Sequence, residues 1–145
     1  MDPTIKSIRA FNRFYARTLG LYDTNAVHTD YSYAQARIIY EIGTHPGCFA
    51  QFLSSYLSID KGYLSRLIDG LEKKHLLYKQ ADAKDSRKKA LFLSEEGKEE
   101  FTRIDEASNA YIEEVLKEKN PQERILLKEA MQVIMKIMEA KDVTD

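Results

Sequence analysis

At 145 residues, 43% hydrophobic and 31% charged, the chain has the length and composition of one globular domain, which excludes the disordered and fibrous classes. It contains no apolar run long enough to cross a membrane and no signal-peptide core at its start, so we expect a cytoplasmic protein. The formal net charge is −1, but residues 61–91 hold nine basic and four acidic side chains, a net +5 against −6 for the remainder. A basic segment of this kind creates a positive local potential, which favours the binding of a polyanion.

The N-terminal part predicts two helices. Pro3 suits the first position of a helix, and apolar or aromatic residues then recur at helical spacing: Ile8, Phe11, Tyr15, Leu19 and Tyr22. The polar stretch 23–32 reads as a connection. A second helix is predicted over 33–44, and His45-Pro46-Gly47 ends it.

Two further helices follow closely. A short helix is predicted over 49–57, although Phe49 is not a usual capping residue. After a turn at Ser58-Ile59, Asp60 is well placed to cap a helix over 61–74. This helix carries an apolar stripe that defines its buried face, formed by Leu64, Leu67, Ile68 and Leu71.

Two short apolar strands are predicted next, over 76–80 and 90–93, and the gap between them is too long for a tight hairpin turn. Ser94 is expected to cap a long helix, which Asn120-Pro121 ends, and a last helix is predicted over 122–141. The fold class is therefore mainly α with a small β-hairpin wing. The order of parts is that of a winged helix-turn-helix domain with additional helices at both ends.

The helix over 61–74 is the candidate recognition helix for double-stranded DNA. Its face opposite the apolar stripe presents a guanidinium that could pair with guanine, flanked by hydroxyls that could donate to phosphates. Gly62 lacks a side chain and could allow close approach to base edges. Asp69 is expected to neutralise Arg66 or Lys73. An ordinary solvated helix face is the alternative. The DNA-binding residues predicted here are Lys61, Gly62, Tyr63, Ser65, Arg66 and Lys73.

The loop between the strands is the candidate wing. Lys84 or Arg87 could enter the minor groove, where negative potential favours a cation, and Lys88 adds to the predicted DNA-binding residues. Asp82 and Asp85 are expected to organise the loop by accepting backbone or arginine hydrogen bonds. A solvated charged loop is the alternative.

These residues resemble the MarR family of bacterial regulators over nearly the whole chain. Leu64–Lys74 is similar to that family's recognition helix, and Asp82–Arg87 to its wing pattern Asp-x-Arg-Asp-x-Arg. Lys84 replaces the first arginine of that pattern, which makes Arg87 the stronger candidate for the groove. Two further departures are His75, where a helix-ending glycine is usual, and Phe49, where a capping Thr or Ser is usual.

A narrower resemblance joins Ile8–Tyr15 and Asp60–Arg66 to MarR-type domains fused to GNAT acetyltransferases. The chain contains no acetyl-CoA-binding segment, so that activity is not transferred to it.

The resemblance implies one MarR-like domain over 1–145, with the winged helix-turn-helix at 33–97 and dimerisation helices at 1–32 and 98–145. The apolar faces of the terminal helices could cover each other within one monomer, but we favour a homodimer, which would bind a pseudo-palindromic operator as a repressor. A protein-interaction module without operator binding is the main alternative.

No catalytic motif, metal-ligand spacing or cofactor site is evident, so an enzyme is not expected. A small aromatic or phenolic effector could bind between the dimerisation and DNA-binding regions, and the tyrosines that could line its pocket are Tyr15, Tyr22, Tyr40 and Tyr111. Ordinary core packing is the alternative for these side chains. Cys48 is expected to pack as a small apolar side chain rather than to sense oxidants.

Overall fold

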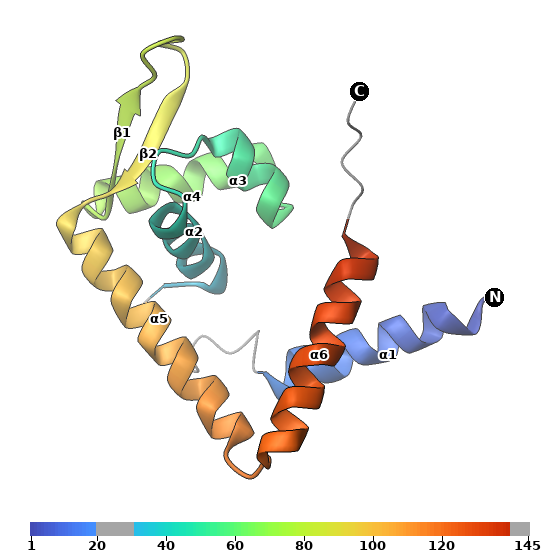
Figure 1. Ribbon diagram of the computed structural model, residues 1–145. Coiled ribbons are helices and arrows are strands. Elements are labelled where there is room, and N and C mark those ends of the chain that lie inside the picture. Colours follow the sequence, from blue (N-terminus) through green and yellow to red (C-terminus); the bar gives the residue numbers. More distant parts are fainter. Residues whose placement is uncertain (20–30, 140–145) are drawn as a thin grey trace. The chain divides into compact units, whose positions relative to one another are not determined.

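A computed structural model describes residues 1–19 and 31–139 (Figure 1). Its element bounds are α1 Pro3–Thr18, α2 Tyr33–Thr44, α3 Ala50–Leu57, α4 Lys61–Lys73, β1 Leu77–Ala81, β2 Lys89–Leu93, α5 Glu95–Leu116 and α6 Pro121–Met138. The predicted class, mainly helical with one hairpin, is confirmed. Tyr22 lies outside the described residues. None of the helices in the described ranges is both long and apolar enough to cross a bilayer.

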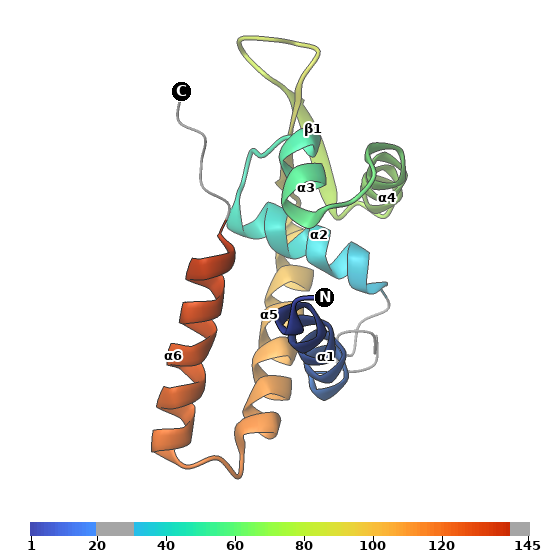
Figure 2. The ribbon, with the colours of Figure 1, turned by 90° about the vertical axis from the view of Figure 1, so that its right-hand side faces the viewer.

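The chain divides into two compact units, Met1–Tyr111 and Ile112–Asp145. The first contains the helix-turn-helix and its hairpin. Figures 1 and 2 both show α2, α3 and α4 gathered at the base of this hairpin, whose loop projects beyond the helices. The second unit consists of the end of α5 and the whole of α6.

Side-chain caps begin five of the described helices, among them α1, α2 and α6. Asp2 accepts from the Thr4 N–H at 2.8 Å, with Pro3 at the predicted first position of α1. Ser32 and Gln35 form a reciprocal capping box at α2, whereas the sequence pattern assigns Ser32 only to the preceding connection. Asn120 and Glu123 form a second box, so that α6 begins at Pro121, one residue before its predicted start.

Both helices of the helix-turn-helix end in left-handed residues. Ser58 closes α3 with φ 54°, and His75 follows α4 with φ 62°. The His75 N–H donates to the Glu72 carbonyl at 2.9 Å, and the Leu76 N–H to the Leu71 carbonyl at 3.1 Å. These two bonds are a Schellman motif with histidine at the position that favours glycine. Histidine thus replaces the usual glycine at a position where the backbone is left-handed.

The hairpin is antiparallel, and its register pairs Leu77 with Leu93 and Ala81 with Lys89. Each strand is shifted or extended by one residue from its predicted bounds. The residues before α3 also join this sheet, because Gly47 N–H donates to the Leu91 carbonyl and Leu91 N–H donates to the Cys48 carbonyl, at 2.8 and 2.9 Å. This bridge fixes the start of α3 against the base of the wing.

The end of α4, the start of β1 and the start of α5 meet at Ser94. The Ser94 hydroxyl donates to the His75 carbonyl at 2.6 Å and accepts from the Gly97 N–H at 3.0 Å, which confirms its predicted capping role. The Ser94 N–H donates to the Leu76 carbonyl at 3.0 Å. A Cβ on Gly97 would lie 1.9 Å from the Leu76 carbonyl oxygen. Only glycine allows α5 to approach the turn before β1 this closely.

The core of the first unit lies between α2, α4 and the hairpin. Its largest fully buried side chains are Ile38, Ile39, Ile42, Leu53, Leu64, Leu71 and Leu91. One charged residue, Glu41, is also buried, with 3% of its surface exposed. Its carboxylate accepts from Arg37 at 3.0 Å and lies 3.4 Å from His45 Nδ1. These partners offset the desolvation of an otherwise unpaired core carboxylate.

Candidate nucleic-acid interface

Each of the nine residues predicted to contact DNA has an exposed side chain or, for Gly62, an exposed backbone. Six lie on α4, beginning at its first residue, and three lie on the loop between β1 and β2. The hydrophobic stripe of α4 faces inward, with Leu64, Ile68 and Leu71 buried. The structure therefore places the predicted residues on accessible surface, and their contact with DNA stays a prediction.

The first turn of α4 is held in shape by Asp60, whose carboxylate accepts from the Tyr63 N–H at 3.1 Å. This confirms the predicted cap. The Arg66 guanidinium lies over the Tyr63 ring, 6.0 Å from its centroid. The contact joins residues three apart on one helical face, which positions the arginine while leaving its donors on the outer side. A Cβ on Gly62 would lie 3.3 Å from the Asp60 carboxylate, so a larger residue there would crowd the cap.

Asp69 does not have the partner expected from the sequence. Its carboxylate accepts from Lys79 of β1, with 2.6 Å between Oδ1 and Nζ. That hydrogen bond, together with the lysine charge, lowers the pKa of the Asp69 carboxyl, to which Lys73 adds only a smaller effect. The same Lys79 lies 3.5 Å from Glu72. Strand alternation places Lys79 on the side of Leu77, toward α4, and a helix-only reading of Asp69 missed this neighbour.

The two wing aspartates organise the loop as expected. Asp82 accepts from the N–H groups of Lys84 and Asp85, at 3.3 and 3.1 Å. Asp85 holds Arg87 by three bonds: from its backbone N–H and Nε, both at 3.1 Å, and from Nη2 at 3.2 Å. These bonds lower the pKa of the Asp85 carboxyl. The Arg87 side chain remains 89% exposed, so it is oriented without being buried.

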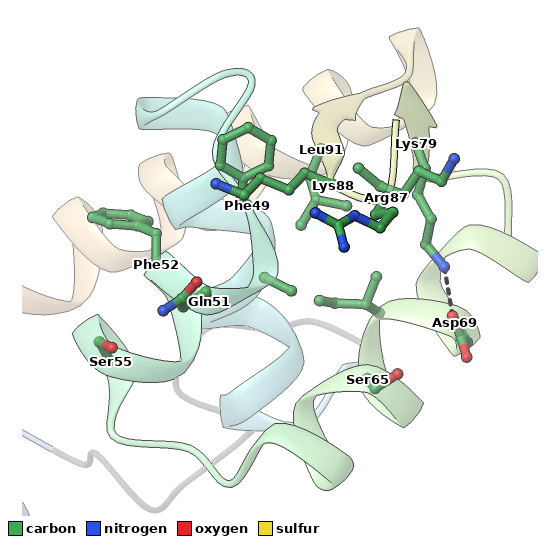
Figure 3. A pocket seen from close by; sticks show the side chains of 13 residues that line it. Phe49, Gln51, Phe52, Ser55, Ser65, Asp69, Lys79, Arg87, Lys88 and Leu91 are labelled. Carbon is green, nitrogen blue, oxygen red and sulfur yellow. Dashed lines mark hydrogen bonds and ion pairs between the residues drawn. The ribbon is translucent and has the colours of Figure 1, made fainter. Parts of the chain in front are cut away.

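A hollow of about 690 Å³ lies between α3, α4 and the base of the wing (Figure 3). Phe49, Phe52 and Ser55 line it from the α3 side, and Ser65, Ile68 and Asp69 from α4. Ala50 and Gln51 of α3 complete that side, and the hairpin contributes Leu91 together with four basic side chains: Lys79, Arg87, Lys88 and Lys89. The structure thus brings the predicted residues Ser65, Arg87 and Lys88 around one concave surface.

The cations of this hollow have internal contacts that orient them. Lys88 Nζ lies 5.7 Å from the centroid of the Phe49 ring, and Lys89 donates to the Ser86 carbonyl at 3.1 Å. Phe49 makes no capping bond to α3. The aromatic residue that replaces the usual cap therefore forms part of the basic surface, a role that its poor capping chemistry could not indicate.

The three described tyrosines of the predicted effector pocket make separate contacts. Tyr40 stacks on Phe101, with 5.3 Å between centroids, and Tyr15 stacks on Phe11 at the same distance. The Tyr111 hydroxyl faces the Thr18 carbonyl at 3.5 Å. These contacts account for the three rings through packing, and an effector site made from them stays a prediction. The fourth member, Tyr22, is outside the described residues.

Cys48 lies in the bridge beside β2, where it is partly buried. Burial raises the pKa of its thiol, and the charge of the nearby Glu41 carboxylate acts in the same direction. A protonated thiol is a weak nucleophile, which fits a packing role. Within the described ranges, no group of three His, Cys, Asp or Glu side chains could hold a metal ion.

Comparison with known proteins agrees with this geometry. Residues 29–88 match the model described as MarR family. The fold is similar to that of a MarR transcriptional regulator from Methanosarcina mazei Go1, with TM-score 0.71, 21% identity and coverage of 94% of this chain and 96% of that one. Wild-type MarR from E. coli in its apo form gives TM-score 0.74 at 20% identity, covering 93% of this chain and 98% of that one.

A third similar structure is a MarR family regulator from Listeria monocytogenes complexed with 26mer DNA. It has TM-score 0.72 and 21% identity, with coverage of 89% of this chain and 86% of that one. At these identities the likeness is one of fold. A search among curated proteins gave no match. The segment 29–88 thus matches the MarR family model, and the fold of the chain is similar to MarR-type structures over nearly its full length.

Proposed function

We propose that this protein is a transcriptional regulator that binds double-stranded DNA through α4 and the wing. The observation that carries the proposal is the arrangement around the hollow, where an exposed helix face and an oriented wing arginine border one basic concave surface. The family match and the similar protein solved with 26mer DNA support the same function. Arg66 is proposed for the major groove and Arg87 for the minor groove.

We also propose that the active form is a homodimer acting as a repressor on a pseudo-palindromic operator. Both α1 and α6 have no buried residue, and their large apolar side chains are exposed. On α6 these include Leu126, Met135, Ile137 and Met138, each at least 63% exposed. A second copy would cover such surfaces. Two recognition helices would then enter successive major grooves roughly 34 Å apart.

The direct test is a duplex selected from genomic fragments, titrated by fluorescence anisotropy over a series of salt concentrations. We expect affinity to fall steeply with salt, because phosphate contacts release counterions. Arg87→Ala and Arg66→Ala should each weaken binding by about 1–3 kcal/mol without unfolding the protein. Arg103→Ala is the matched control, because it removes an exposed arginine of α5, outside the basic segment.

Two results would overturn the proposal. Unchanged affinity in both arginine variants would exclude their assigned roles. Absence of duplex binding by the wild type at low salt would favour the rival function, a winged helix that binds another protein. We further propose that an aromatic or phenolic effector lowers the affinity of the wild type for DNA, because it favours a conformation of the protein that binds DNA less tightly.

A further inference from the structure

We propose that Lys79 is a positioning residue of the recognition surface, which neutralises the carboxylates of Asp69 and Glu72 on α4 and does not itself bind DNA. This inference rests on the proposed function, because it concerns how the α4 face becomes compatible with phosphates. It assigns a task to the basic side chain that β1 contributes to the hollow.

Lys79 links β1 to α4, the helix that precedes it in the chain. It is the central residue of β1, and its Nζ lies 2.6 Å from Asp69 and 3.5 Å from Glu72. The two carboxylates are three residues apart, so they lie on one face of α4. Figure 3 shows the lysine side chain reaching from the strand to Asp69. The ammonium therefore joins the base of the wing to the recognition helix.

The charges explain why such a contact is needed. Asp69 and Glu72 are 52% and 42% exposed, on the helix that also presents Arg66 and Lys73. Without a cation between them, the two carboxylates would repel phosphates and reduce the attraction of the neighbouring basic residues. Lys79 reduces the charge of this three-residue cluster from −2 to −1.

The exposure of Lys79 indicates that it acts through the helix rather than on a ligand. Its side chain is 29% exposed, whereas that of Arg87 is 89% exposed. A phosphate contact would require the ammonium to give up a charge-assisted hydrogen bond at 2.6 Å. The hydrogen bonds of Arg87 are instead to Asp85 of its own loop, and they leave most of its side chain exposed.

A double-mutant comparison separates positioning from direct contact. Lys79→Met should weaken duplex binding roughly tenfold at low salt, because it leaves two unneutralised carboxylates on α4. Adding Asp69→Asn restores the wild-type net charge, so Asp69→Asn/Lys79→Met should return to within about twofold of the wild type with the same salt slope. Lys79→Arg should retain binding. A direct phosphate contact instead predicts a double variant as weak as Lys79→Met, with a slope smaller by about 1.

Two further measurements keep the inference open to refutation if Lys79→Met folds poorly. Asp69→Asn alone keeps Lys79 and removes a carboxylate, so it should bind duplex as tightly as the wild type or more tightly. Weaker binding by this variant would refute the proposal. In an NMR titration, the pKa of the Asp69 carboxyl should lie below its usual range in the wild type, because Lys79 donates to it, and a pKa within the usual range would refute the contact.

Failure of this inference is distinct from failure of the proposed function. If the wild type shows no salt-dependent duplex binding, the function is wrong. If the wild type binds and the double variant remains as weak as Lys79→Met, only the role of Lys79 is wrong.

Discussion

Two glycine-to-alanine substitutions should change stability in opposite directions. In Gly97→Ala, the new methyl would lie 1.9 Å from the Leu76 carbonyl oxygen, whereas ordinary contact begins near 3.4 Å. The helix and strand must therefore separate by about 1.5 Å. In Gly70→Ala, nothing lies within 4 Å of the new methyl, and the residue is inside α4. The same chemical change thus meets a blocked position in one helix and an open one in another.

The contacts give the expected changes in the free energy of unfolding. Overpacking costs about 1–3 kcal/mol, and loss of the bond from Ser94 N–H to the Leu76 carbonyl adds about 0.5–1.5 kcal/mol. Better helix propensity returns at most about 1 kcal/mol, so Gly97→Ala should lose about 2 kcal/mol. Gly70→Ala has only the propensity gain, about 0.5–1 kcal/mol.

Thermal unfolding followed by circular dichroism tests both values. At roughly 3 °C per kcal/mol for a chain of this size, Tm should fall by about 6 °C in Gly97→Ala and rise by about 2 °C in Gly70→Ala. All samples need one protein concentration, because association shifts Tm by mass action. If the two variants had the same Tm, or if Gly97→Ala were as stable as the wild type, α5 would not approach Leu76 as closely as described.

Two further substitutions test other features. His75→Gly should raise Tm by about 2 °C, because relief of the left-handed strain, about 1–2 kcal/mol, exceeds the added chain entropy of glycine, about 0.5–1 kcal/mol. His75→Ala keeps the strained backbone, so an equal rise in that variant would contradict the reasoning. The wild type and Cys48→Ala should bind duplex equally well, with or without peroxide, because burial raises the pKa of the Cys48 thiol and makes it a weak nucleophile. Peroxide release of DNA from the wild type alone would establish a sensing role and refute the packing role.

Local chemistry made most of the elements predictable. Pro3, Asp60 and Ser94 each act where their side chains suit a helix start, and the stripe Leu64, Ile68 and Leu71 identified the buried face of α4. These features depend on neighbours within four residues, which the sequence displays directly.

The charge partners of the site were harder to predict where they join different elements. Asp85 and Arg87 are two residues apart, and their pairing within the wing could be expected. Asp69 and Lys79 are ten residues apart and meet only because the Schellman turn at His75 folds β1 back along α4. A helix-only reading offered Arg66 and Lys73 at ideal spacings and missed the partner on the strand.

The contact made by Phe49 could not be predicted for a different reason. As a capping residue it has no useful hydrogen-bonding group, and α3 indeed begins without a side-chain cap. Its ring instead supports Lys88 from the wing. That contact depends on the bridge between Cys48 and Leu91, which brings the two segments together and has no local signature in the sequence.

The bonds between Asp85 and Arg87 have a consequence for binding entropy. An arginine that is free in solution loses rotational freedom when it enters a groove, and immobilising such a side chain costs about 0.5–1.5 kcal/mol. In this wing, two side-chain hydrogen bonds to Asp85, from Nε and Nη2, restrict Arg87 while it remains exposed. Much of its rotamer freedom is therefore lost when the loop folds, before any anion arrives. In the proposed complex with DNA, Arg87 would therefore enter the groove in a preorganised state.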